Sequence, residues 1–394
     1  MAGNRICAVI GNYDFSENAD RLSQGISAYF KTIIVDSSSP NPPNTDHIII
    51  PNTYYPGLWN AAVGYALEQD FEWLMFVASD LQITDIDHLC RCAIEATNHD
   101  KVGIYTPSVS PDSRCAFSVM FNRTLATIRE CGLSEGFFFL ARLSILKKLY
   151  PISEEYKFGW GIDMACCFEA YQQNKIVVAD DRIMIHHPES KLEHSIDKSL
   201  ALEENINICS PEILKWANDI NSELSYEIRS LLKTSSLDIG CGQNPRNNFG
   251  ADYLYGIDII NINSDNVKKA DLNIENIPFE SESFDYVTAT DFIEHVARMI
   301  YAPDLRFPFI ELMNEIGRVL KPGGVFLSVT PAFPDIKAFQ DPTHVNFITE
   351  NTFYDYFCEP KLWAKMYGFS RKFQILNQYW DDGKLVTYLR ALKQ

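Results

Sequence analysis

The segment LDIGCGQNP, residues 237–245, decides the fold of the C-terminal half of this chain. Its start, which contains Asp238, is a predicted strand that leads into a turn with Gly240 and Gly242. A second apolar run, YLYGIDI, reaches Asp258 about 18 residues after Gly240. Glycines let the backbone approach a bound molecule closely, and an acid that ends the next strand can accept hydrogen bonds from ribose hydroxyls. The pattern therefore predicts a nucleotide site at one edge of a wound α/β sheet.

The segments that follow continue the alternation of strands and helices. FDYVTAT (284–290) and GGVFLSVTP (323–331) are predicted strands, and FIELMNEIGRVL (309–320) has one apolar helical face. The following KPGG is expected to end that helix, because proline and glycine cannot continue it. Together with DFIEHV (291–296), this ordered set resembles the class I S-adenosylmethionine-dependent methyltransferases over roughly 210–394. The turn also lacks the GxGxxG pattern of dinucleotide sites, which favours a cofactor without a pyrophosphate.

The resemblance implies a Rossmann-like domain whose residues contact S-adenosylmethionine. These contacts would be made by Asp238, Gly240 and Gly242 around the methionine part, Asp258 at the ribose, Asp271 and Leu272 beside the adenine, and Asp291 along the inner side of the cofactor. A Rossmann-like domain that binds another nucleotide, or none, is the alternative.

Two histidines of this half are candidates for proton removal. Methyl transfer to a sugar hydroxyl needs a base, because the hydroxyl is a poor nucleophile. His295 lies in DFIEHV, and His344 lies in QDPTHVNFIT; similar DPTH segments occur in sugar-directed members of the resembled class. A structural role for His295 stays open. Asp341 and Asp291 are alternative candidates, as ligands of a divalent metal that orients sugar hydroxyls.

The N-terminal half poses a different question at FEWLMFVASDLQIT, residues 71–84, where an apolar run ends on Asp80. Around it, ICAVIGN (6–12) and KTIIVDSSS (31–39) are predicted strands and GLWNAAVGYALEQ (57–69) is a predicted helix. The alternation predicts an α/β layer with a mostly parallel sheet. An acid at the carboxyl end of a parallel strand points into the crevice where such sheets bind ligands. Asp80 is therefore a candidate ligand for a metal that neutralises a diphosphate.

The order of these segments, together with FGWGIDMACC and ADDRIMIHHP, resembles the GT-A-fold glycosyltransferases, particularly the inverting enzymes of family 2. The resemblance covers roughly residues 5–190. It implies a nucleotide-diphosphate sugar as the donor and a glycan as the acceptor. The donor would lie against Asn12, Asp14, Asp36, Asn60 and Asp80.

The metal motif departs from that family. Its usual signature has two acids that flank one residue, whereas this chain has Ala78-Ser79-Asp80 and keeps only the last acid. His186 or His187 could add a ligand, so the candidate site for Mn²⁺ or Mg²⁺ consists of Asp80, His186 and His187. The alternative is that Asp80 caps the helix expected to begin near Asp85.

Asp163, in FGWGIDMACC, matches the acid that serves as the base in the inverting glycosyltransferases. It would deprotonate the acceptor hydroxyl as that oxygen attacks the anomeric carbon. The alternative is an acid in the first turn of a helix, where the helix dipole favours negative charge.

Composition limits the possible partners. The 394 residues suggest two domains, for which we expect 1–190, a helical connector at 191–234, and 235–394. With 34 basic and 52 acidic residues the net charge is −18, which argues against a nucleic-acid partner. The ten cysteines are scattered without zinc spacing, and no apolar stretch is long enough for a membrane span, so we expect a cytoplasmic protein. The oligomeric state stays open.

These patterns lead to one functional hypothesis and one alternative. The hypothesis is a bifunctional enzyme that transfers a sugar to a glycan and methylates a sugar hydroxyl with S-adenosylmethionine. The alternative is a sugar O-methyltransferase whose N-terminal domain only binds glycan.

Overall fold

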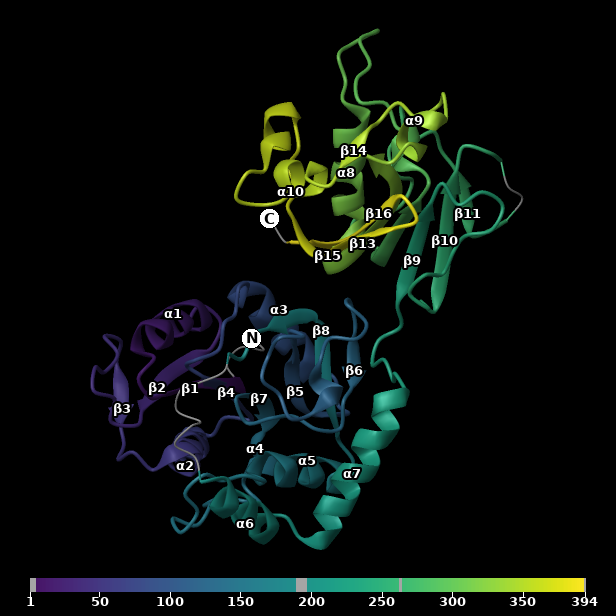
Figure 1. The fold of residues 1–394 in the computed structure, drawn as a ribbon. Coiled ribbons are helices and arrows are strands. Elements are labelled where there is room, and N and C mark those ends of the chain that lie inside the picture. The colour runs from purple at the N-terminus through teal and green to yellow at the C-terminus, as the bar shows by residue number, and fades with distance from the viewer. Residues whose placement is uncertain (1–4, 189–196, 262–263, 393–394) are drawn as a thin grey trace. The chain divides into compact units, whose positions relative to one another are not determined.

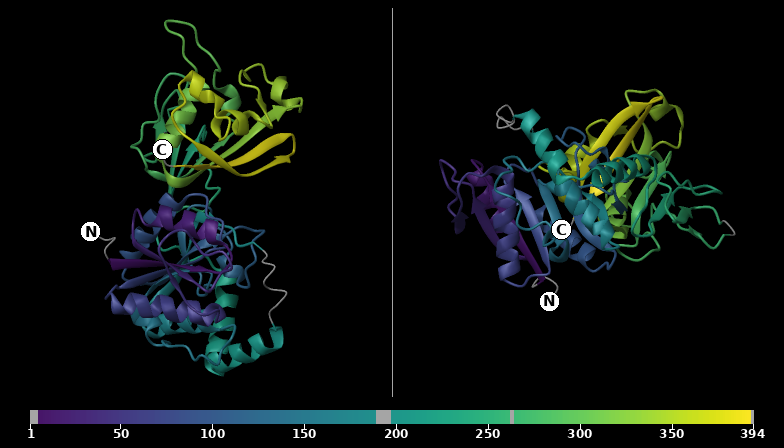
Figure 2. Two further views of the ribbon diagram at one scale, coloured as in Figure 1. Left: turned by 90° about the vertical axis from the view of Figure 1, so that its left-hand side faces the viewer. Right: turned by 90° about the horizontal axis from the view of Figure 1, so that it is seen from below.

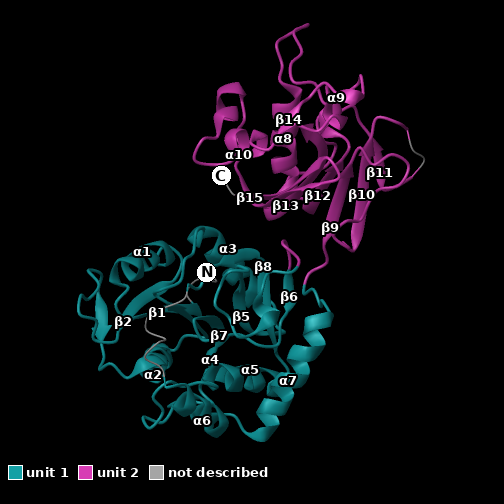
Figure 3. Cartoon of the chain, viewed as in Figure 1, with its two compact units in different colours: residues 1–123, 128–231 teal, residues 124–127, 232–394 magenta. Residues whose placement is uncertain are grey.

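The computed structural model describes residues 5–188, 197–261 and 264–392. The chain divides into two compact units, each described here by itself (Figure 3). Unit 1 consists of Met1–Arg123 and Ile128–Leu231, and unit 2 of Thr124–Thr127 and Leu232–Gln394. Each unit contains a sheet of eight strands, which confirms the predicted α/β class.

Unit 1 is built on a mixed sheet with the strand order β3-β2-β1-β4-β7-β5-β8-β6 (Figure 1). The pairs β1–β2, β1–β4, β2–β3 and β5–β8 are parallel, as the sequence predicts. Strands β6 and β7 run antiparallel to their neighbours, which the sequence analysis did not anticipate. The strands are β1 Ile6–Asn12, β2 Lys31–Asp36, β3 His47–Ile49, β4 Trp73–Ala78, β5 Val102–Val109, β6 Ile128–Glu130, β7 Phe138–Arg142 and β8 Ile176–Ile185.

Helices cover both faces of this sheet. In Figure 1, α1 and α3 lie on one side and α2, α4 and α5 on the other. Asp85 caps α3, because its side chain accepts a hydrogen bond of 2.8 Å from the backbone of His88. The helices are α1 Ser16–Ile26, α2 Tyr54–Glu68, α3 Ile86–Thr97, α4 Leu143–Leu146, α5 Ile162–Gln172, α6 Lys198–Ile208 and α7 Pro211–Tyr226, with a short 3₁₀ turn, η2, at Ser118–Met120.

The segment predicted as a helical connector contributes its two helices, α6 and α7, to unit 1. Ser210 caps α7 by accepting a hydrogen bond from the backbone of Ile213. The apolar side of α7 then joins the same core as α2 and α5 through Ala217, Ile220 and Leu224. This burial explains why the segment belongs to the first unit rather than standing free between two domains.

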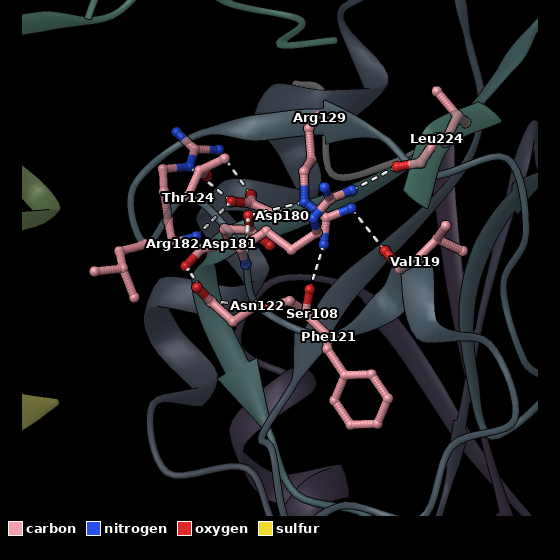
Figure 4. A network of polar contacts seen from close by, with 12 residues as sticks. Ser108, Val119, Phe121, Asn122, Thr124, Arg129, Asp180, Asp181, Arg182 and Leu224 are labelled. Atoms are coloured by element: carbon pink, nitrogen blue, oxygen red, sulfur yellow. Dashed lines mark hydrogen bonds and ion pairs between the residues drawn. The ribbon is translucent and has the colours of Figure 1, made fainter. Parts of the chain in front are cut away.

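A buried ion pair joins β6 to β8 in unit 1 (Figure 4). Nε of Arg129 lies 2.9 Å from Oδ2 of Asp181, and both side chains are almost fully buried. The guanidinium also donates to the carbonyl oxygens of Val119 and Phe121. The charge of Arg129 can be buried here because the ion pair and these hydrogen bonds compensate for its lost hydration.

Unit 2 has a sheet with the order β11-β10-β9-β12-β13-β16-β15, and β14 pairs with β13. Strands β9 to β13 are parallel, whereas β15 and β16 form an antiparallel hairpin, the yellow strands of Figure 2. The strands are β9 Ser235–Ile239, β10 Tyr253–Asp258, β11 Val267–Lys269, β12 Phe284–Thr290, β13 Leu320–Phe333, β14 Ile348–Thr349, β15 Phe373–Asp381 and β16 Lys384–Ala391.

Helix α8 (Pro308–Val319) buries the predicted apolar face in the core of unit 2, through Phe309, Leu312, Met313 and Ile316. It ends at Val319, so KPGG follows the helix but already lies within β13. The remaining helical segments are η4 Ile293–His295, α9 Lys337–Gln340, α10 Thr352–Phe357 and η5 Trp363–Tyr367.

The ten cysteines are all free thiols. Among the described residues, no helix combines the length and the apolar character that a membrane crossing would require.

Candidate functional site

The turn after β9 has the conformation that its glycines permit. Gly240 and Gly242 have φ of +69° and +57°, which other residues rarely adopt. A Cβ on Gly240 would lie 2.5 Å from the ring of Phe292, so this position is closed to any side chain. A Cβ on Gly242 would meet nothing within 4 Å, so the turn leaves open space on its outer side.

Two predicted acids are fixed around this turn. Oδ2 of Asp258 accepts a hydrogen bond of 2.8 Å from the backbone of Gly242. Asp238 accepts from the hydroxyl of Thr288 at 2.6 Å and from the backbone of Arg246 at 2.8 Å. Burial raises the pKa of Asp238, although these hydrogen bonds oppose the effect. Asp238 thus holds the turn together, and Asp258 ends β10 beside it.

The other predicted cofactor residues follow β11 and β12. Leu272 is buried, and the preceding Asp271 accepts a hydrogen bond of 3.0 Å from the backbone of Asn273. Asp291 is exposed, has φ of +53° and pairs with Nζ of Lys384 at 2.6 Å. Because β9, β10 and β12 are parallel, these acids and the glycine turn share the carboxyl edge of the sheet.

The two predicted histidines lie side by side in unit 2. The ring centroids of His295 and His344 are 4.8 Å apart. They meet because the loop around His344 bonds to the 3₁₀ turn of His295. The backbone N–H groups of Val345 and Asn346 both donate to the carbonyl oxygen of Glu294 at 2.9 Å.

Both histidines border a hollow of about 560 Å³ together with Asp291, Glu294 and Asp341. Thr343 connects His295 to Asp341: its hydroxyl lies 3.0 Å from Nδ1 of His295 and 2.6 Å from Oδ1 of Asp341. The hydrogen bonds from Thr343 lower the pKa of Asp341.

Sequence reasoning missed Glu294, the residue directly before His295. Its side chain is 1% exposed, and burial raises its pKa. Oε2 accepts a hydrogen bond from Thr330, whereas Oε1 has no partner. An acid next to a candidate histidine in DFIEHV was the available signal.

In unit 1, hydrogen bonds join the predicted residues at and just beyond the ends of β1 and β2, of which Asn12 and Asp36 are buried and Asp14 is exposed. The side-chain amide of Asn12 donates to Oδ1 of Asp36 at 2.7 Å. Ser39 bonds to Asp36 through its hydroxyl and its backbone, and its hydroxyl also accepts from the backbone of Asp14. The structure therefore brings Asn12, Asp14 and Asp36 together.

The candidate metal ligands of unit 1 are only partly gathered. Oδ2 of Asp80 lies 3.5 Å from Nε2 of His187, and the other oxygen of Asp80 has no partner. His186 instead faces Ser110 and Asp112. Asp85 rather than Asp80 caps α3, so the capping alternative for Asp80 is wrong.

Asn60 and Asp163 bond to other residues. Both polar atoms of the Asn60 side chain bond to the backbone of Ile152, which gives Asn60 a structural role. Asp163 is half-buried in the first turn of α5, and burial, then the neighbouring charge of Glu135, raises its pKa to about 7. It also borders a small void of about 10 Å³. Glu135 was not singled out from the sequence.

A family model described as a methyltransferase domain matches residues 237–328. This part of the chain is a methyltransferase domain. The match begins within β9 and ends within β13, so it includes Asp238, Asp258 and His295 but not His344. No curated protein matches the sequence.

Solved structures resemble the chain only distantly. The YcgJ protein from Bacillus subtilis has 15% identity and a TM-score of 0.28, covering 41% of this chain and 93% of its own. A methyltransferase dependent on S-adenosylmethionine from Mesorhizobium loti has 16% identity and a TM-score of 0.27, covering 40% and 91%. The mannosyltransferase PcManGT from Pyrobaculum calidifontis, in complex with GDP-Man and Mn²⁺, has 12% identity and a TM-score of 0.35, covering 56% and 75%.

Proposed function

We propose that this chain is a bifunctional enzyme of glycan synthesis. Unit 2 methylates a sugar hydroxyl with S-adenosylmethionine, and unit 1 transfers a sugar from a nucleotide-diphosphate donor to a glycan. The observation that carries the first activity is the pairing of His295 and His344, 4.8 Å apart, in the unit that holds the methyltransferase domain.

The turn after β9 fits S-adenosylmethionine. The open side of Gly242 admits a ligand close to the backbone. The carboxylate of Asp258, at the end of β10, accepts from the backbone of Gly242 and Ile260 and keeps further lone pairs for ribose hydroxyls. Asp238 is used by Thr288 and Arg246, so it supports the turn that receives the methionine part. Bound S-adenosylmethionine supplies a methyl group that is already activated on sulfur, so the protein must position the acceptor and remove its proton.

The surface beside the two histidines suits a sugar acceptor. Phe333, Phe339 and Phe347 are 54%, 51% and 37% exposed, and the rings of Phe339 and Phe347 stack at 4.8 Å. Exposed aromatic groups of this kind mark binding surfaces, and the apolar face of a sugar ring can pack on them. We propose that the acceptor lies here, with one hydroxyl directed to His295 and His344, which act on its proton.

Sugar transfer in unit 1 rests on Asp163 as the base. As the acceptor oxygen bonds to the anomeric carbon, the bond to the diphosphate breaks and the proton passes to Asp163. A carboxyl group with a pKa of about 7 suits this role near neutral pH. The Asn12 and Asp36 group would hold the nucleoside, and Asp80 with His187 would hold Mn²⁺ or Mg²⁺ at the diphosphate.

The alternative, a sugar methyltransferase whose unit 1 only binds glycan, is favoured by two observations. Asp80 is the only acid of the family's metal motif, and Asn60 is occupied by the backbone of Ile152. The Asp163→Asn variant separates the two hypotheses. Loss of sugar transfer supports the enzyme, whereas absence of transfer by the unaltered chain, across a panel of nucleotide sugars, supports the binding module.

Methyl transfer is tested by incubating the full chain with S-adenosylmethionine and oligosaccharide acceptors and measuring S-adenosylhomocysteine. We expect product with the glycan that unit 1 makes, or a close neighbour, and little with unrelated small alcohols. Equal rates with small alcohols would contradict the proposed acceptor.

A further inference from the structure

Three potential metal ligands converge in unit 2. One ligand atom each from Glu294, His295 and His344 lies within 4.8 Å of the other two. Among the described residues, these form the one group of three or more such side chains found close enough to share an ion. These side chains can bind a cation only if the atoms that face it carry lone pairs rather than protons.

The hydrogen bonds of His295 determine its tautomer. The hydroxyl of Thr343 has a single proton, which it donates to Oδ1 of Asp341 at 2.6 Å. Its oxygen must then accept from Nδ1 of His295, 3.0 Å away. Nδ1 therefore carries the hydrogen, and Nε2 of the neutral ring presents a lone pair. A carboxylate that orients a histidine through a second group is typical of metal sites.

The other two side chains also offer an atom with a free lone pair. Nδ1 of His344 lies 3.3 Å from the carbonyl oxygen of Ala338, which can only accept, so Nε2 of His344 is also left with a lone pair. Oε1 of Glu294 has no partner although the side chain is 1% exposed. Unpaired buried carboxylate oxygens are costly, so this atom requires a proton or a cation.

We infer that Glu294, His295 and His344 bind one divalent transition-metal cation. Two imidazoles and one carboxylate suit ions such as Zn²⁺, Co²⁺ or Mn²⁺ and leave coordination positions open. Ligands about 2.1 Å from one ion lie at most about 4.2 Å apart, so the group needs less than about 1 Å of closure. The open positions would face the hollow shared with Asp291 and Asp341.

The role of this ion in catalysis rests on the proposed methyl transfer. The cation would lower the pKa of an acceptor hydroxyl bound to it, so that this hydroxyl would pass its proton to solvent water. Its oxygen then forms the bond to the methyl carbon as the carbon–sulfur bond breaks, and that electron pair stays on sulfur. His295 and His344 would thus act on the acceptor proton as ligands rather than as free bases.

The test is a titration of the metal-stripped full chain with Co²⁺, followed by visible absorption and calorimetry in the absence of nucleotide. We expect one Co²⁺ per chain, and affinity lowered more than about tenfold in His344→Ala and Glu294→Gln. Thr343→Val removes the orienting hydroxyl and is expected to weaken binding about tenfold. His47→Ala, remote in sequence at the start of β3, is the matched control, and His187→Ala removes the candidate ligand of unit 1.

Several results would overturn the inference. They are absence of Co²⁺ binding, binding unchanged by His344→Ala, and binding lost in His187→Ala instead. Binding of S-adenosylmethionine to each variant shows whether unit 2 is still folded, and the exposed Thr343 gives a variant that leaves the core untouched.

The same samples separate this inference from the proposed function. Methyl transfer by the metal-free chain would support the proposed methyltransferase activity and refute the role of the ion. Co²⁺ binding that depends on His344, without methyl transfer to any glycan, would leave the metal site standing and refute the proposed reaction.

Discussion

Asp163 is the residue whose protonation should control sugar transfer. Burial and the charge of Glu135 raise its pKa to about 7, and Tyr55, Cys166 and Cys167 lie around it without adding a positive charge. A base must be deprotonated to act, so we expect the rate of sugar transfer to rise with pH and level off above about 7. Steady-state rates between pH 5 and 9 measure this.

The matched variant for this profile is Asp163→Asn, which keeps the size of the side chain but cannot accept the proton. We expect its rate to fall by about 10²–10⁴-fold. A flat profile together with an unchanged rate in the variant would exclude Asp163 as the base.

The raised pKa of Asp163 also affects stability. The folded chain holds this proton up to about pH 7, whereas the unfolded chain releases it near the ordinary aspartate pKa of 3.8. The unfolded state therefore binds fewer protons between these values, and this group lowers the free energy of unfolding as pH rises through that window. Asp163→Asn should remove this contribution in urea unfolding at pH 4.5 and 7.5. An identical pH dependence of the free energy of unfolding in both proteins would contradict the raised pKa of Asp163.

Gly240 should be intolerant of any side chain. Its φ of +69° disfavours L-residues by about 1 kcal/mol, and a Cβ would also overlap the ring of Phe292. We expect Gly240→Ala to lower the stability of unit 2 by more than about 2 kcal/mol and to weaken binding of S-adenosylmethionine. Gly250→Ala is the control, because φ there is +63° but the Cβ meets nothing within 4 Å. Equal losses of stability in the two variants, measured by thermal unfolding, would show that backbone strain alone, without the overlap with Phe292, explains the effect.

At the scale of elements, the Arg129–Asp181 pair should hold β6 against β8. Removal of one partner leaves a buried charge without compensation, which costs about 3–5 kcal/mol. We expect Arg129→Met to lower the unfolding midpoint of unit 1 strongly. Arg229→Met, which removes partly exposed ion pairs, should change the stability by less than about 1 kcal/mol. Similar losses of stability in the two variants, measured by calorimetry, would mean that the buried pair stabilises unit 1 no more than the exposed pairs do.

Some elements could be predicted because one local pattern determined them. The glycine turn followed a strand that ends at Ile239 and preceded one that ends on Asp258, and the apolar face of α8 was complete in the sequence. The β15–β16 hairpin had a local signal that was not used, since Asp382 and Gly383 form its turn with positive φ, as Asp-Gly turns do.

Other features depend on contacts between distant segments. No local pattern shows that β7 runs antiparallel between β4 and β5. Glu294 lies beside His344 because backbone hydrogen bonds join residues about 50 positions apart. A periodic pattern in the sequence does not reveal such bonds. The candidate residues were therefore found from sequence more readily than their grouping, and Asn60 and His186 turned out to face other partners.

At the scale of the whole molecule, the proposed function requires two separate ligand sites in one chain. A ligand that binds only the folded state raises its stability, by about 2.7 kcal/mol at 100 times the dissociation constant. Each site should respond to its own ligand, because the candidate residues belong to different units.

The most direct test is thermal unfolding with S-adenosylmethionine and, separately, with nucleotide sugars in the presence and absence of Mn²⁺. We expect S-adenosylmethionine to stabilise the chain but not Asp258→Ala. The control is Asp265→Ala, which removes an exposed acid just before β11 and should still respond to S-adenosylmethionine. One nucleotide sugar should stabilise all three proteins. Stabilisation by S-adenosylmethionine alone would leave unit 1 as a binding module. No stabilisation by S-adenosylmethionine would contradict the central claim that unit 2 is built to use it.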